Sequence, residues 1–209
     1  MITIYTLTYN EELLIQFMID HYRSRFPNCH IVVYDNSSTD KTVSIAKHNS
    51  CEIRTYNSGG TLDDGLHMDI KNSCWKDAKT DWVLVCDLDE LLDITEDQLK
   101  QEEAIGTTKI KADGWSMVNL EDNYNVAEIK HAIKEWGYDK DMLFNKKFVK
   151  EINYGAGCHE SKPEGQIKNS LSNYKMYHYK YINPDLVVTK YHLTATRLSD
   201  RNIKNNWGH

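Results

Sequence analysis

Short apolar runs alternate with longer amphipathic segments along the first 90 residues of the chain. The runs are rich in β-branched and aromatic residues, which predicts strands over residues 1–8, 30–34, 53–56 and 82–86. The segments between them repeat apolar residues at helical spacing, which predicts helices over residues 11–26 (with Asn10 as N-cap), 41–48 and 66–78. This alternation predicts an α/β fold with a mainly parallel central sheet flanked by helices.

The pattern is weaker after residue 90. Strands are predicted within residues 110–120 and over 142–149 and 173–181, because these stretches again favour β structure. Helices are predicted over residues 126–136, where Gly137 would end the helix, and over 184–204. No internal repeat, low-complexity linker or shift in composition divides the chain, so residues 1–209 are expected to form a single domain.

Three carboxylates follow the predicted strand at 82–86 within four positions. Asp87, Asp89 and Glu90 stand where this strand would leave the sheet. Crowded acids repel one another unless a cation or hydrogen-bond donors meet them, and Mg²⁺ and Mn²⁺ favour carboxylate oxygen. A buried strand that runs into an acidic turn would give the same letters. The motif therefore points to a metal site only if other strand ends bring matching chemistry to it.

Polar residues also follow the first two predicted strands. Thr8, Tyr9 and Asn10 come after the first strand, and Asp35 and Asn36 come after the second. In open α/β sheets the ligand lies outside the carboxyl ends of the strands. Because the strands are expected to be parallel, these polar residues and the acids after residue 86 are expected to meet in one crevice.

Composition argues against several classes of protein. The chain has 209 residues, 40% hydrophobic and 27% charged, which suits one globular domain, and no apolar run reaches the roughly 18–20 residues of a membrane span. A net charge of −6 argues against a general nucleic-acid binder. Five widely spaced cysteines without a C-x-x-C pair, and a start without a signal-peptide pattern, predict a cytoplasmic protein, in the host cytoplasm if the chain is viral.

Charge is unevenly distributed along the chain. Residues 1–141 hold 14 Lys and Arg against 26 Asp and Glu, a net of −12, whereas residues 142–209 hold 11 against 5, a net of +6. An acidic half suited to a cation would face a basic half suited to phosphate or an anionic acceptor. Ordinary surface charge, segregated by chance, would give the same numbers.

Five motifs occur in an order typical of one enzyme family. They are Leu7-Thr8-Tyr9-Asn10-Glu11-Glu12, Asp35-Asn36-Ser37-Ser38-Thr39-Asp40, the stretch from Lys71-Asn72-x-x-Trp75-Lys76 to Asp87-Leu88-Asp89-Glu90, Gly157-Cys158-His159-Glu160, and Tyr177-His178-Tyr179. With them the chain resembles the family-2-like glycosyltransferases of GT-A, Rossmann-like fold. The last two are similar to the H-E and H-Y-x-Y motifs of lipopolysaccharide-core-type members. The compact length is also similar to that of an amino-terminal glycosyltransferase domain from chloroviruses.

The resemblance implies a transfer of a sugar from a UDP-sugar to a glycan or glycoprotein acceptor. The residues that it assigns to the nucleotide are Thr6, Thr8, Asn10, Asp35, Lys71 and Asp87. The residues that it assigns to the metal, Mn²⁺ or Mg²⁺, are Asp87, Asp89 and His178. Residues 1–90 would form the nucleotide-binding half of the domain, and residues 91–209 would form the acceptor half.

The chain departs from the family pattern in two places, which concern the catalytic general base and the recognition of the nucleotide. Asn36 follows Asp35 where many members have a second acid, and the E-D base motif has no clear copy, since Glu121-Asp122 comes too soon after the D-x-D and is interpreted as a solvated turn. Glu160 is the candidate general base of an inverting transfer, because the small residues 155–157 would let the backbone approach a ligand. The alternative is a structural pairing of this glutamate with the preceding histidine.

Two other functions stay open. A sugar nucleotidyltransferase also uses paired acids on an α/β sheet, but it normally has a Gly-rich basic loop where this chain has Thr8-Tyr9-Asn10-Glu11. A metal- and UDP-sugar-binding module without catalysis would carry the same motifs, so only turnover separates it from an enzyme. A phosphate-binding P-loop is excluded, because Ser58-Gly59-Gly60-Thr61 lacks the lysine of that motif. A dinucleotide-binding motif is also excluded, because Glu160 stands where the third glycine of that motif is needed.

Overall fold

The computed structural model describes residues 1–119 and 125–208, so Glu121-Asp122 lies outside the described residues. The elements in chain order are β1 (Ile2–Thr8), α1 (Ile15–Arg25), β2 (His30–Asp35), α2 (Thr42–His48), β3 (Glu52–Thr55), α3 (Asp64–Ser73), β4 (Trp82–Asp87), β5 (Glu90–Leu92), α4 (Glu96–Ala104), β6 (Lys109–Val118), η1 (Val126–Glu128), β7 (His131–Lys134), η2 (Trp136–Tyr138), β8 (Lys140–Asn145), β9 (Val149–Glu151), η3 (Ala156–Cys158), β10 (Glu164–Gly165), β11 (Asn169–Tyr181), α5 (Pro184–Arg197) and α6 (Asp200–Asn205).

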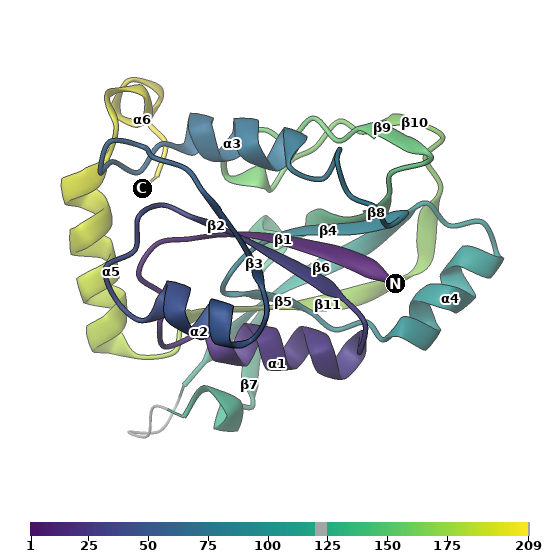
Figure 1. The fold of residues 1–209 in the computed structure, drawn as a ribbon, viewed down its shortest axis with the longest axis horizontal. Coiled ribbons are helices and arrows are strands. Elements are labelled where there is room, and N and C mark those ends of the chain that lie inside the picture. Colours follow the sequence, from purple (N-terminus) through teal and green to yellow (C-terminus); the bar gives the residue numbers. More distant parts are fainter. Residues whose placement is uncertain (120–124, 209) are drawn as a thin grey trace.

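One large sheet organises the fold (Figure 1). Its strand order is β3-β2-β1-β4-β8-β6-β11-β5, and β7 pairs with β6. The four strands from β3 to β4 are parallel, as is the pair β6 and β11. The strand β8 is antiparallel to both β4 and β6. The α/β fold with a mainly parallel central sheet is therefore confirmed, and the second half of the chain contributes the antiparallel strands.

The strand β4 is buried on both faces, as its run of apolar residues predicts. Leu84 and Cys86 pack into the core that α1 and α2 cover, whereas Val83 and Val85 pack with Trp75 on the opposite face, where α3 lies (Figure 1). Side chains that alternate between two cores require apolar residues at every position of the strand. The polar residues begin at the first position beyond this double burial.

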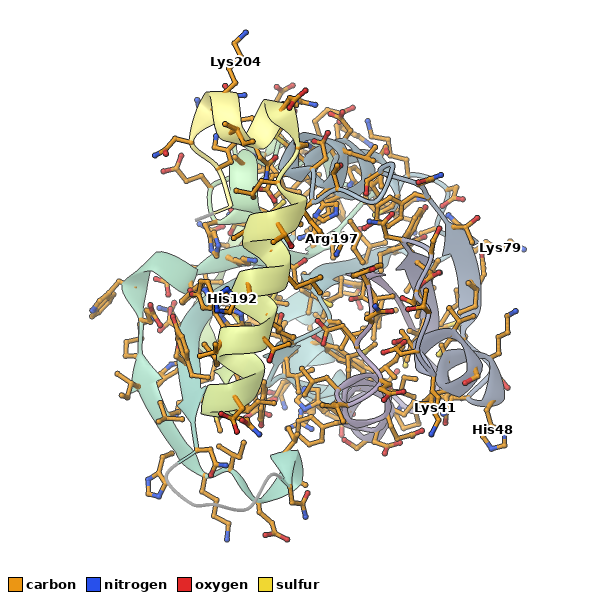
Figure 2. The ribbon with its side chains drawn as sticks, turned by 90° about the vertical axis from the view of Figure 1, so that its left-hand side faces the viewer. Lys41, His48, Lys79, His192, Arg197 and Lys204 are labelled. Atoms are coloured by element: carbon orange, nitrogen blue, oxygen red, sulfur yellow. The ribbon has the colours of Figure 1, made fainter. Side chains whose placement is uncertain are left out.

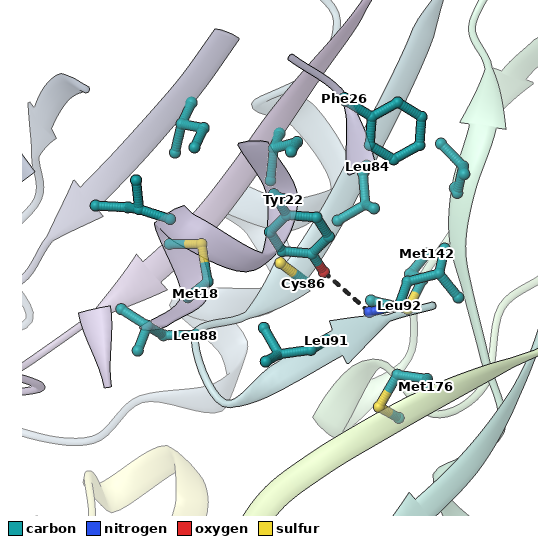
Figure 3. Packing of buried hydrophobic residues seen from close by; sticks show 14 of the residues in the cluster. Met18, Tyr22, Phe26, Leu84, Cys86, Leu88, Leu91, Leu92, Met142 and Met176 are labelled. Carbon is teal, nitrogen blue, oxygen red and sulfur yellow. Dashed lines mark hydrogen bonds between the residues drawn. The ribbon is translucent and has the colours of Figure 1, made fainter. Parts of the chain in front are cut away.

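The helix α1 fixes the short strand that follows the D-x-D motif. The hydroxyl of buried Tyr22 donates a hydrogen bond to the carbonyl of Glu90 at 3.0 Å and accepts one from the backbone N–H of Leu92 at 3.2 Å (Figure 3). Leu91 and Leu92 are themselves buried in the same core. Buried polar groups need partners, so these bonds hold the start of β5, and with it the acidic turn, in one position.

The predicted helix over residues 126–136 is wrong. The chain there forms η1, β7 and η2, and β7 pairs with the end of β6 in antiparallel register. The sequence His131-Ala132-Ile133-Lys134 alternates exposed and half-buried residues, which is the period of a strand. Pairing with β6 therefore decides the conformation of a segment that could also follow a helical pattern.

Two other predicted elements are each divided in the structure. The predicted strand over 142–149 becomes β8 and β9, because a turn opens at Asn145, whose carbonyl accepts from Phe148 N at 3.1 Å. The predicted helix over 184–204 becomes α5 and α6, because Ser199 caps α6 and its N–H donates to the carbonyl of Leu62. The break gives the backbone near residue 198 a partner in a distant loop.

Helix starts also differ from the predicted ones. Leu14, not Asn10, precedes α1, and α3 begins at Asp64 with Asp63 as its N-cap rather than at Leu66. Asp63 accepts a hydrogen bond from Leu66 N at 3.0 Å, as an N-cap does.

Within the described ranges, no helix combines the length and the apolar character that crossing a membrane requires.

Candidate active site

Two adjoining cavities open at the carboxyl ends of β1 and β4. The first has a volume of about 340 Å³ and the second of about 540 Å³. The residues that line both are Glu11, Leu62, Asp64, Asp87, Asp89, Gly157, Lys190 and Thr194. The acids of the D-x-D motif thus stand in the wall between two spaces, as the convergence of strand ends predicts.

The loop after β1 is tied to the loop after β2. Asn10 has a φ of +54°, and its side-chain oxygen accepts a hydrogen bond from Thr39 N at 2.8 Å, while its own N–H donates to Ser38 Oγ at 2.9 Å. Both carboxylate oxygens of Asp35 accept from Ser38 N at 3.2 Å. The cluster of Asn, Ser, Thr and Asp in these loops therefore builds one rigid rim, since such side chains hold turns by bonding backbone N–H groups.

The predicted nucleotide residues do not all reach the first cavity. Thr8 and Asn10 line it, together with Lys71 and Asp87. Thr6 and Asp35 are buried beside this cavity and do not line it. Asn36 lines it in place of Asp35. The hydroxyls of Thr6 and Thr8 are buried without a hydrogen-bond partner among the described residues.

Four charged side chains form a largely buried cluster in the walls of the cavities. Lys71 on α3 lies 2.6 Å from one carboxylate oxygen of Asp87, and Lys140 at the start of β8 lies 3.3 Å from the other. Lys140 also pairs with Glu90, whose second oxygen accepts from Asp87 N at 3.1 Å. The exposed fractions of the two lysine side chains are 5% and 4%, and that of Glu90 is 2%. Two cations therefore compensate two acids, and only the Asp87 side chain, which is 36% exposed, keeps contact with water.

This cluster keeps Asp87 ionised. Burial alone would raise the pKa of Asp87, but the Lys71 and Lys140 ammonium groups hold it well below its usual range. Burial disfavours the charged form of Lys71 as well, and the facing Asp87 carboxylate outweighs this and raises the pKa of the lysine. The first acid of the motif is therefore a fixed anion that two lysines hold in place.

The second acid of the motif has a different partner. A carboxylate oxygen of Asp89 lies 3.6 Å from Nε2 of His178 on β11. Burial would raise the pKa of Asp89, but His178 outweighs this effect and holds it below its usual range. Burial in turn would lower the pKa of His178, and the Asp89 carboxylate raises it instead. The sequence places these residues 89 positions apart, and the pairing of β11 with β5 brings them together.

The residues around Asp89 suit a divalent cation only with help from a ligand. In residues 1–119 and 125–208, no three His, Cys, Asp or Glu side chains lie close enough together to hold an ion by themselves. A carboxylate oxygen with an imidazole nitrogen suits Mn²⁺, and Mg²⁺ is usually held by one or two carboxylates together with substrate phosphates. Nδ1 of His178 is also buried without a described partner, so the ring is not committed to another network. The donor set therefore fits an ion that arrives with a diphosphate.

The helix α5 closes the same end of the sheet. Figure 2 faces this end and shows α5 in front of the strands, with Arg197 near its final turn. The Arg197 guanidinium lies 3.6 Å from the ring centroid of Tyr9 and donates to the carbonyl of Gly60 at 2.8 Å. Lys190, two turns earlier, pairs with Glu11 at 2.7 Å. Both basic residues line the first cavity.

The candidate base does not stand in either cavity wall. The Glu160 side chain is exposed, and its carbonyl accepts from Gly155 N at 2.9 Å in a turn. The preceding His159 does line the second cavity, and burial lowers its pKa to about 4. Gly157 has a φ of +69°, and a Cβ there would lie 3.0 Å from the His159 ring, so the turn itself favours glycine at this position, which also lines both cavities.

A match to a family model identifies the protein family of the chain. Residues 3–157, about three quarters of the chain, match the model of glycosyl transferase family 2. The chain belongs to this family. No curated protein matches the sequence significantly.

Solved structures show which fold this chain shares. The 1–349 fragment of S. aureus TarS in complex with UDP has a TM-score of 0.56 at 15% identity, over 94% of this chain and 64% of that one. The same fragment in complex with UDP-GlcNAc has a TM-score of 0.50 at 16% identity, over 94% and 66%. This family-2 chain therefore has the GT-A fold and spans about two thirds of that fragment.

Sequence reasoning missed several residues of the site. Lys140 gives no sequence signal, because only the sheet brings β8 beside Asp87. The basic face of α5 could have been found, since Lys190, Thr194 and Arg197 recur at helical spacing.

Proposed function

We propose that this protein is a metal-dependent glycosyltransferase that moves a sugar from a UDP-sugar to a hydroxyl of a glycan or glycoprotein acceptor. The observation that carries the proposal is the meeting of Lys71, Asp87 and Asp89 at the carboxyl ends of parallel strands in a family-2 chain. A diphosphate needs positive charge, and the transfer increases negative charge on its oxygens. This site offers lysines, an arginine and acids suited to a divalent ion.

The two cavities support a division into a nucleotide-binding half, residues 1–90, and an acceptor half, residues 91–209. Of the described residues that line the first cavity, 14 of 20 come from the first half. Of those that line the second, 13 of 19 come from the second half. The donor would therefore bind in the first cavity and the acceptor in the second, with the acids of the D-x-D between them.

We propose UDP as the nucleotide, with Thr6, Thr8, Asn10, Asp35, Lys71 and Asp87 as the residues that form its site. The TarS structures with UDP and with UDP-GlcNAc support this choice of donor. Tyr9, which carries the Arg197 guanidinium on its ring, offers a further aromatic surface at the same cavity. Thr6 and Asp35 would act from beside the cavity, by fixing the strand ends.

Asp87, Asp89 and His178 would hold Mn²⁺ or Mg²⁺. The ion would act as a Lewis acid that offsets the charge of the departing diphosphate. Lys71 and Lys140 keep Asp87 ionised for this role, and His178 does the same for Asp89. The match of His159-Glu160 and Tyr177-His178-Tyr179 to lipopolysaccharide-core-type motifs gains support from His159 and His178, which both line the second cavity.

Glu160 stays the candidate general base of an inverting transfer. A base acts across the sugar from the diphosphate, and Glu160 must turn towards the second cavity to do so. Glu160→Gln should keep UDP-sugar affinity and lose roughly 10²–10⁴-fold in transfer rate. A Gln variant with near-normal transfer, or a product that retains the donor's anomeric configuration, would direct the search to Asp139 or Asp141.

Release of UDP from a set of UDP-sugars, measured with Mn²⁺ and candidate acceptors, tests the proposal. A transferase releases UDP faster when its acceptor is present, and Asp89→Ala abolishes that release. Binding of UDP with Mn²⁺ but no release from any donor would instead identify a binding module without catalysis.

A further inference from the structure

The cations that line the two cavities differ in whether a carboxylate neutralises them. Lys71, Lys140 and Lys190 each pair with an acid. Arg197 and Lys180 have no acidic partner at ion-pair distance in the described part of the chain. Arg197 lies in the first cavity, where a nucleotide would use its charge, whereas Lys180 lies in the second. Lys180 therefore brings an uncompensated positive charge to the acceptor side.

Three tyrosines from three different elements surround this ammonium. The Lys180 Nζ lies 5.9, 5.5 and 5.2 Å from the ring centroids of Tyr138, Tyr181 and Tyr191, and it donates to the Tyr138 hydroxyl at 3.3 Å. Aromatic faces attract a cation, so the three tyrosine rings hold the ammonium in place.

The acids of the second cavity have partners of their own. The pairs are Glu11 with Lys190, Asp64 with Asn202, Asp87 with Lys71, Asp89 with His178, and Glu90 with Lys140. Asp64 has only a neutral amide as its partner, and none of these five acids forms an ion pair with Lys180. An anion that enters this cavity therefore meets, at Lys180, a cation that none of these acids pairs with directly.

We propose that Lys180 and its tyrosines recognise a carboxylate or phosphate group on the acceptor sugar. Tyr138, Tyr191 and Trp207 line the same cavity and offer ring faces to a sugar, while Lys180 offers a charged donor. The Tyr138 ring also packs edge-on against His178 with centroids 4.5 Å apart. The anion subsite thus lies beside the Asp89 end of the cavity. The inference rests on the proposed function for the reaction, but the binding that it requires can be measured separately.

The chain offers a matched control for Lys180. Lys175 lies on the same strand, β11, and its Nζ is 4.8 Å from the ring centroid of Trp115, so it also forms a cation–π contact. Lys175 is exposed and lines neither cavity. Lys180→Gln and Lys175→Gln therefore remove the same charge from the same strand, and only the first removes it from the second cavity.

Titration of the whole protein with methyl glucuronide, methyl glucoside and glucose 6-phosphate, in the presence of UDP and Mn²⁺, tests the proposal by NMR. The wild type should bind the two anionic sugars about 10–100-fold more tightly than the neutral glycoside, because a hydrogen bond to a charged group contributes that much. Lys180→Gln should remove the preference, while Lys175→Gln and Lys180→Arg should keep it. Raising the ionic strength should weaken it.

Three results of the sugar titration would overturn the proposal. They are a wild type without preference for the anionic sugars, a Lys180→Gln variant that keeps the preference, and an equal loss in Lys175→Gln. A preference for UDP-glucuronate over UDP-glucose that depends on Lys180, without any effect on the free glycosides, would assign the anion to the donor and also overturn it. If Lys180→Gln does not fold, the wild type, Lys180→Arg and the ionic-strength series decide. A wild type that does not bind UDP would contradict the proposed function instead, so the two failures can be distinguished.

Discussion

Replacement of Lys140 by Met tests whether the buried four-charge cluster is built as the structure shows. Lys140 faces Glu90 and Asp87, and both the lysine and Glu90 are almost wholly shielded from water. Lys140→Met leaves the buried Glu90 carboxylate without its cation, whereas Asp87 keeps Lys71 at 2.6 Å. The predicted loss in the free energy of unfolding therefore comes from one uncompensated buried charge.

The expected cost is about 3–5 kcal/mol of the free energy of unfolding, the usual result of removing one partner of a buried ion pair. A domain of this size is typically stable by only about 5–15 kcal/mol, so the loss would be plain. The double variant Lys140→Met/Glu90→Gln should recover most of it, because the Gln side chain removes the charge and can still accept from Asp87 N. The change in the free energy of unfolding of the double variant, minus the sum of the changes in the two single variants, gives the interaction energy between Lys140 and Glu90.

Urea unfolding followed by circular dichroism measures these free energies, with the slope of the transition checked for constancy. Lys147→Met is the matched control, because Lys147 pairs with Asp81 at 2.6 Å on the exposed surface, where an ion pair contributes about 0–1 kcal/mol. The reasoning is refuted if Lys140→Met costs no more than Lys147→Met, or if the double variant is no more stable than Lys140→Met alone.

Three further variants extend the test to the site. Asp89→Ala should keep the fold and lose metal-dependent UDP binding, and a variant that binds UDP with Mn²⁺ normally would return the acid to a structural role. His178→Ala should weaken Mn²⁺ affinity by a smaller factor, measured by calorimetry with UDP present, and an effect on stability alone would make it a packing residue. Burial raises the pKa of Glu11 from 4.5 to about 6 despite Lys190, so the ionisation of Glu11 should remove about 2 kcal/mol of stability as the pH rises from below 4.5 through 6. Glu11→Gln should lack this pH-dependent loss, and an identical pH profile of unfolding for both proteins would contradict it.

The first half of the fold could be predicted from the sequence because each signal there is local. The run from Trp82 to Cys86 is apolar at every position, and in the structure both faces of β4 are buried. The polar residues after the first, second and fourth strands meet because parallel strands end at one edge, which is a rule of topology rather than of any one residue. The meeting of Asn10 and Asp87 at one cavity follows from it.

The second half could be predicted less well, because non-local pairing decides it. Residues 131–134 form a strand only through β6, and the pairing of β11 with β5 joins His178 to Asp89. Lys140 lies in no motif and Lys180 stands at the variable position of H-Y-x-Y, since their roles depend on partners that come from other elements. Glu160 was chosen for its small neighbours, of which Gly157 does line both cavities, whereas the exposed Glu160 side chain lines neither.

Thermal unfolding with nucleotides tests the central claim most directly. UDP, GDP and CMP are each added at a fixed concentration, with and without Mn²⁺, to the wild type and to Asp89→Ala. Because a ligand stabilises the state that binds it, UDP with Mn²⁺ at about 100 times its dissociation constant should add about 2.7 kcal/mol to the wild type. GDP and CMP should add much less, and Asp89→Ala should not respond to the metal. Equal stabilisation by GDP and UDP, or a full metal-dependent response of Asp89→Ala, would contradict the account.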